Sequence, residues 1–134
     1  MIRRPKNFIE IMELRKSGVP AYVTNGDFLD EFYAAPNRLK QSFLDDEPPL
    51  IKGVEITPSA LAQFAAIAEK LAHDYDLHVP EWTSKPIYYL DTPYLAGKPA
   101  NEYPRELIEC LIDETPIEFS KRNLIVTDNI LERR

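Results

Sequence analysis

The chain has 134 residues, of which 44% are hydrophobic and 28% are charged. This length and apolar content support one folded domain and exclude disorder as the main state. The net charge of −6 disfavours general nucleic-acid binding, because phosphate backbones repel an acidic surface. No apolar run approaches the roughly 20 residues of a membrane span, and the opening Met-Ile-Arg-Arg does not resemble a secretory signal. We therefore expect a cytoplasmic protein.

Three helices are predicted near the N-terminus. Apolar residues at helical spacing indicate a helix over 7–17 that ends at Gly18, and a second over 27–35. Residues 37–44 add a further turn or two of helix. Residues 21–24, between the first two helices, have the composition of a short strand.

The acidic and double-proline stretch within residues 45–56 is the best candidate for an internal boundary. This composition is typical of a stiff, solvated connector. Because residues 1–44 alone are close to the lower size limit for independent folding, we expect one domain over 1–134. It would have an N-terminal helical lobe (1–44) and a C-terminal helical lobe (57–134).

The clearest element is an amphipathic helix over residues 57–76. Thr57 is a good N-cap and Pro58 suits the first helical position. Its apolar positions recur at spacings of three and four, and several are alanines that let a neighbouring helix approach closely. We expect this to be the central helix, with an apolar face made of Leu61, Phe64, Ala65, Ala68, Leu71, Ala72 and Tyr75.

The chain contains 12 prolines and 4 glycines, and the prolines of the C-terminal half mark helix starts. Pro86, Pro104 and Pro116 each precede a short helical pattern. Strand signals are confined to residues 21–24 and 124–127, too few for a sheet-based fold. We predict a mainly all-α fold, in which several short helices with proline-rich connections surround the central helix.

Catalytic patterns are sparse. His73 and Asp74 could begin a metal site in a metal-dependent hydrolase or nucleotide-processing enzyme, but no remote histidine completes the ligand set. Cys110 falls on the apolar face of a predicted helix, so we expect a buried, unreactive thiol. The four isolated glycines form no phosphate-binding loop. The sequence therefore predicts no catalytic residue, metal or cofactor, and it favours binding over catalysis without settling the choice.

A second alternative is a DNA-binding regulator. The helices over 7–17 and 27–35 could form a helix-turn-helix, with Arg3, Arg4 and Lys40 contacting phosphates. Two observations oppose it: the predicted connector is longer than usual, and the second helix begins with acidic residues.

Aromatic residues gather between prolines from Pro80 to Pro99. Held by prolines, they could form a rigid recognition surface with a small entropic cost of ordering. The alternative, which we favour, is that they wrap the central helix as a satellite core. The candidate interaction residues are Trp82, Tyr88, Tyr89 and Tyr94, together with Phe119, Arg122 and Asn123 further along the chain.

Four segments of the C-terminal half carry a family resemblance: Leu71-Ala72-His73, Val79-Pro80-Glu81-Trp82, Tyr89-Leu90-Asp91-Thr92-Pro93-Tyr94, and the run from Thr115 through Val126. From Leu61 to about Leu131 the chain resembles a small uncharacterised bacterial all-α domain that often occurs beside helix-turn-helix regulators. Relatives have Pro-Trp-Phe where this chain has Pro93-Tyr94-Leu95. The resemblance implies a regulatory or toxin-antitoxin-like context and no particular reaction.

The sequence thus predicts a protein-interaction or regulatory module. Its acidity suits a basic protein partner such as a toxin or a DNA-binding regulator. Self-association is left open by the sequence, whereas membrane binding and nucleic-acid binding are disfavoured.

Overall fold

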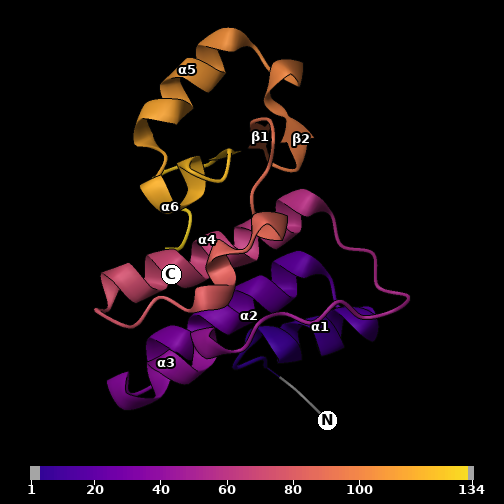
Figure 1. Ribbon diagram of the computed structural model, residues 1–134, viewed down its shortest axis with the longest axis vertical. Coiled ribbons are helices and arrows are strands. Elements are labelled where there is room, and N and C mark those ends of the chain that lie inside the picture. Colours follow the sequence, from indigo (N-terminus) through magenta and orange to yellow (C-terminus); the bar gives the residue numbers. More distant parts are fainter. Residues whose placement is uncertain (1–3, 133–134) are drawn as a thin grey trace.

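The computed structural model describes residues 4–132 and is mainly helical, as predicted (Figure 1). Its α-helices are α1 (Phe8–Lys16), α2 (Ala21–Ala34), α3 (Asn37–Asp45), α4 (Pro58–Asp74), α5 (Arg105–Glu114) and α6 (Ile117–Ser120). Its 3₁₀ turns are η1 (Glu81–Ser84), η2 (Pro86–Tyr88) and η3 (Ala100–Glu102), and its strands are β1 (Tyr94–Leu95), β2 (Lys98–Pro99) and β3 (Leu124–Ile125). No helix within the described residues is both long enough and apolar enough to cross a membrane.

Helix α4 is the central helix, as predicted. It runs through the middle of the molecule, with α1, α2 and α3 on one side and α5, α6 and the strands on the other (Figure 1). The Thr57 hydroxyl accepts a hydrogen bond from the amide of Ala60, and Pro58 opens the first turn. The helix ends at Asp74, and Asp76 adopts a left-handed conformation with φ of 54°.

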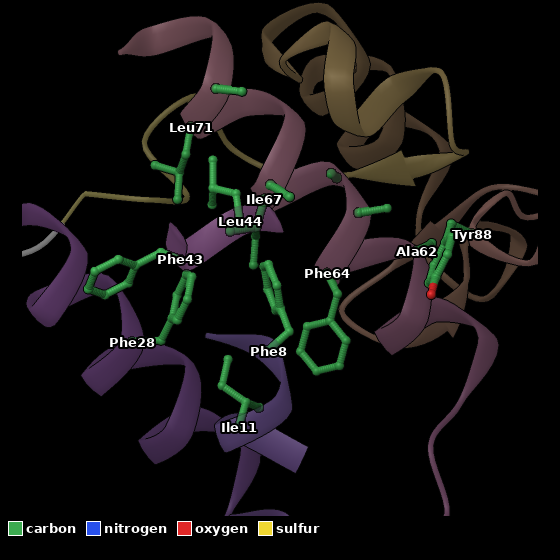
Figure 2. Packing of buried hydrophobic residues seen from close by; sticks show 14 of the residues in the cluster. Phe8, Ile11, Phe28, Phe43, Leu44, Ala62, Phe64, Ile67, Leu71 and Tyr88 are labelled. Carbon is green, nitrogen blue, oxygen red and sulfur yellow. The ribbon is translucent and has the colours of Figure 1, made fainter. Parts of the chain in front are cut away.

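The main core is built from aromatic side chains around α4. Phe8 of α1 lies 4.9 Å from the ring of Phe28 and 5.6 Å from that of Phe64, measured between centroids. Figure 2 shows these three rings together with Phe43 and Leu44 beneath the face of α4. All five are buried, so residues from both sides of the 45–56 segment share one hydrophobic cluster.

Helix α2 begins at Ala21, so the strand composition of residues 21–24 was misleading. The preceding Pro20 is extended and its carbonyl accepts hydrogen bonds from Val23 and Thr24. Thr24 and Phe28, one turn apart, are both buried, and the Thr24 hydroxyl donates to the carbonyl of Ala21 at 3.1 Å. Burial of this helix face overrides the preference of these residues for a strand.

A buried lysine closes the end of α2. Lys40 of α3 is 3% exposed, and its ammonium donates to the carbonyls of Phe32 at 2.9 Å and Ala35 at 2.6 Å. The same ammonium lies 5.3 Å from the ring centroid of Tyr75. A cation at a helix C-terminus satisfies carbonyls that have no intrahelical partner, so Lys40 fixes α3 against α2.

The strands form one small sheet in the order β2-β1-β3. Strands β1 and β2 are antiparallel across a turn at Ala96 and Gly97, both with positive φ, whereas β1 and β3 are parallel with Tyr94 opposite Leu124. Strand β3 lies within the predicted strand 124–127. Strands of two residues are too short to show a sequence period, which is why β1 and β2 were not predicted.

The C-terminal segment returns from this sheet to α2. Leu131 is buried, and its carbonyl accepts a hydrogen bond from the hydroxyl of Tyr33 at 2.7 Å. The two sides of α4 are therefore tied together by the segment after β3 as well as by α4 itself.

Candidate functional site

A buried ion pair joins α4 to the segment after α6. Oε1 of Glu69 lies 2.6 Å from Nη1 of Arg122, and Oε2 accepts from Nζ of Lys121 at 2.5 Å. The side chain of Arg122 is fully buried and also donates to the backbone carbonyls of Glu118 and Thr83, each at 2.8 Å. The arrangement locks α6 and η1 onto the central helix.

Burial acts to raise the pKa of Glu69, but the hydrogen bonds from Lys121 and Arg122 outweigh burial and hold its pKa below the ordinary glutamate value. Glu69 is therefore ionised at neutral pH. Both carboxylate oxygens of Glu69 and both terminal nitrogens of Arg122 are paired, so the pair holds the fold together and offers no free acid or base.

His73 also faces this cluster. Its Nδ1 lies 2.6 Å from Oε2 of Glu118, and its Nε2 lies 3.8 Å from Oε2 of Glu69. Asp74 instead pairs with Lys70 at 3.1 Å. Residues 4–132 contain no group of three or more His, Cys, Asp or Glu side chains placed to hold a metal ion. Within the described residues, His73 and Asp74 are therefore not part of an assembled metal-ligand set, which the metal-dependent enzyme alternative requires.

Four of the seven candidate interaction residues are buried. The indole of Trp82 donates to the carbonyl of Leu44 at 3.0 Å, and the hydroxyl of Tyr88 donates to Glu47 at 2.6 Å. Together with Phe119 and Arg122, these side chains have no more than 6% of their surface exposed. Trp82 and Tyr88 belong to the core, as the satellite-core interpretation of the Pro80–Pro99 segment expects, because η1 and η2 pack on α4. Phe119 of α6 belongs to the same core, and Arg122 is buried in the ion pair with Glu69.

The other three candidates are half-buried. Tyr89 lies under the guanidinium of Arg122 at 4.8 Å, and Tyr94 belongs to β1. Asn123 has a φ of 62° and its amide donates to the carbonyl of Leu90 at 2.7 Å. Whether a partner contacts any of these three stays a prediction.

The N-terminal lobe bears directly on the DNA-binding alternative. The connector between α1 and α2 is shorter than predicted, since it contains only residues 17–20. The candidate cations, however, are engaged: Arg4 pairs with Asp27 at 3.3 Å and Asp30 at 3.1 Å, and Lys40 is buried. Arg3 lies outside the described residues. Of the three cations named for phosphate contact, the two that the structure describes are held by other parts of the chain.

Sequence reasoning missed a surface at α5. The helix is strongly amphipathic, yet none of its residues is buried. Leu107 is 42% exposed and Ile112 is 51% exposed, while Ile108 and Leu111 are half-buried. The prediction that Cys110 is buried was wrong, because the apolar face of α5 covers the small sheet only in part. We call the four apolar residues Leu107, Ile108, Leu111 and Ile112 the α5 surface.

A cavity of about 170 Å³ opens beside Ile112, between the C-terminal end of α5, the segment after α6 and β3. Its walls are mostly apolar and include one of the predicted candidates, Asn123. The lining residues are Pro93, Ile112, Thr115, Ser120, Asn123, Leu124 and Ile125.

The surroundings of this surface are acidic. Helix α5 carries four exposed carboxylates against one exposed cation, Arg105, which already pairs with Glu109 at 2.9 Å. The carboxylates are those of Glu106, Glu109, Asp113 and Glu114.

A larger hollow lies elsewhere, between α2, the end of α4 and the C-terminal segment. It measures about 670 Å³ and is mainly bordered by polar and charged residues. Among them, Lys70 and Asp74 pair with each other, and Tyr33 bonds to Leu131. A smaller share of its lining is therefore apolar than in the cavity beside Ile112.

Comparisons with models of protein families, with curated proteins and with solved structures found no match to the chain.

Proposed function

We propose that this protein is a protein-interaction module and that it binds a basic protein partner through the α5 surface. The observation that carries the proposal is that an amphipathic helix presents its apolar edge to solvent beside an open apolar cavity. Leu107 and Ile112 each keep about half of their surface exposed. Covering them stabilises a complex by about 1 kcal/mol per residue, since full burial of such a side chain contributes roughly 1.5–3 kcal/mol.

Charge supports a basic partner over a second copy of the chain. The exposed carboxylates of α5 and the net charge of −6 would attract Lys- and Arg-rich surfaces and accelerate their association. A symmetric homodimer through α5 would place two acidic helices side by side, and such like-charge contacts oppose binding. The resemblance of the C-terminal half supports the proposal of a regulatory context, with a basic toxin or a DNA-binding regulator as this partner.

Site-directed photo-cross-linking in host cells tests the proposal. A photoreactive phenylalanine analogue replaces Leu107 in one variant and Ile112 in another. The control places it at Tyr22, which is 81% exposed and lies on α2, away from α5. We expect one discrete adduct from both α5 positions and none from Tyr22, with a partner of high isoelectric point. Adducts from Tyr22 alone, or none from α5, would overturn the proposal.

A further inference from the structure

We infer that the cavity beside Ile112 is an anchor site for one large apolar side chain, Leu, Met or Phe, carried by a Lys- and Arg-rich amphipathic helix of the partner. This inference rests on the proposed function and specifies how the α5 surface recognises its partner. It follows from the size of the cavity, the polar groups at its walls, the edges of the sheet and the distribution of charge.

The cavity has the size of a single side chain. Its volume of about 170 Å³ is close to the roughly 150 Å³ of an apolar protein cavity that accommodates benzene. Ile112, Leu124 and Ile125 supply apolar walls from α5 and β3. An aromatic or branched aliphatic side chain would fill it, and interface hot spots characteristically occupy pockets of this kind.

The polar side chains at the walls are already engaged within the chain. The hydroxyl of Thr115 lies 2.7 Å from the carbonyl of Leu111 and 2.8 Å from that of Val126. The amide of Asn123 donates to Leu90, and Ser120 is 3.4 Å from the carbonyl of Ile117. An apolar occupant leaves these hydrogen bonds intact, whereas a polar occupant would compete with them.

The sheet edges argue for a helical partner. Addition of a strand requires free backbone groups at an edge. At the outer edge of β3, the hydroxyl of Thr115 contacts both the amide and the carbonyl of Val126. At the other edge, β2 ends with Pro99, which has no amide proton to donate. The backbone groups of Val126 and the nitrogen of Pro99 are thus not open to an added strand, which favours a partner that engages side chains through an amphipathic helix.

Acidic residues flank the apolar stripe of α5. At 100° per residue, Glu109, which pairs with Arg105, projects next to Ile112 on one side of the stripe, and Glu114 projects next to Leu111 on the other. A helix seated between them would place one cation at Glu114, and a second cation would compete with Arg105 for Glu109. This pattern defines the partner as a basic amphipathic helix rather than a generally basic surface.

Two labelled peptides test the inference. Both are Lys- and Ala-rich amphipathic helices, one with a central Phe and one with Ala at that position. We expect the Phe peptide to bind about tenfold or more tightly than the Ala peptide in fluorescence anisotropy, with affinity falling as salt rises. Ser120→Leu fills the cavity from an exposed position and should remove the preference for Phe. Ser42→Leu on α3 is the matched control, because its hydroxyl also bonds the carbonyl three residues earlier, and it should retain the preference.

Methyl NMR of the unmodified protein gives an independent measurement. The Phe peptide should shift the methyl signals of Ile112, Leu124 and Ile125, and those of Ile11 and Ile67 in the main core should stay unchanged. Equal affinity for the two peptides, or no binding of either, would overturn the inference that this cavity is an anchor site. An α5 cross-link obtained alongside that result would leave the proposed function standing. Absence of the cross-link would remove the proposed function itself.

Discussion

The buried pair of Glu69 and Arg122 yields the sharpest stability prediction. Replacing Glu69 with Met leaves the guanidinium of Arg122 inside the protein without its carboxylate. Breaking one partner of a buried pair costs about 3–5 kcal/mol, a large part of the stability of a domain this size. Arg122→Met should cost a similar amount, because it removes the fully buried partner of Glu69 and leaves the half-exposed side chains of Lys121 and His73 beside it.

The double variant Glu69→Met/Arg122→Met separates this electrostatic effect from packing. Removing both charges leaves no uncompensated buried ion, since Lys121 can turn to solvent, so the double variant should lose no more stability than either single variant. Urea unfolding at pH 7 gives the three free energies, with a coupling of about 2 kcal/mol or more expected. Additive losses would refute the reasoning, because they would mean that the two side chains act independently.

The pH dependence follows from the same pair. The folded-state pKa of Glu69 is lowered, so its contribution is complete above the ordinary glutamate pKa of about 4.3. It is lost as the pH falls from there through the lower folded-state value. Glu69→Met should therefore show a shallower loss of stability on acidification than the unchanged protein does. If both proteins lost stability equally steeply on acidification, the inferred lowering of the Glu69 pKa would be contradicted.

Three further outcomes follow from individual contacts. Lys40→Met should lower the free energy of unfolding by about 2 kcal/mol in the urea assay, because the carbonyls at the end of α2 lose a charged donor. The control Arg38→Met, at an exposed position of the same helix, should change the free energy of unfolding by less than about 0.5 kcal/mol. Equal effects of the two substitutions would contradict the capping role of Lys40. Cys110 should react with a thiol reagent in the folded protein within a few-fold of its rate in denaturant, and reaction only after unfolding would show that α5 is covered. Tyr88→Phe should cost about 1–2 kcal/mol in thermal or urea unfolding because Glu47 loses its hydroxyl donor, and no loss would mean that water replaces it freely.

Local signals in the sequence predicted most of the helical framework. Thr57 and Pro58 identify the start of α4, and Pro116 precedes α6, because capping and a fixed proline φ act over a few residues. The start of α2 was not predicted, because it depends on packing against distant parts of the chain. Its first turn is helical because Thr24 packs inward, a tertiary effect that residue preferences do not record.

The candidate site could be predicted only in part. Aromatic residues between prolines are compatible with a surface or a core, and only the position of α4 shows that Trp82 and Tyr88 are inside. The period of α5 correctly indicates an apolar face. It cannot say how much of that face another element covers, so Cys110 was predicted to be buried and the exposure of Ile112 was not predicted.

Hydrogen exchange of the chain with and without its captured partner tests most directly whether α5 is the docking surface. Amides of α5 and of residues 123–125 should become protected in the complex, while those of α1–α3 should exchange as they do in the free chain. Protection confined to α1–α3, with α5 exchanging at its free rate, would contradict the account.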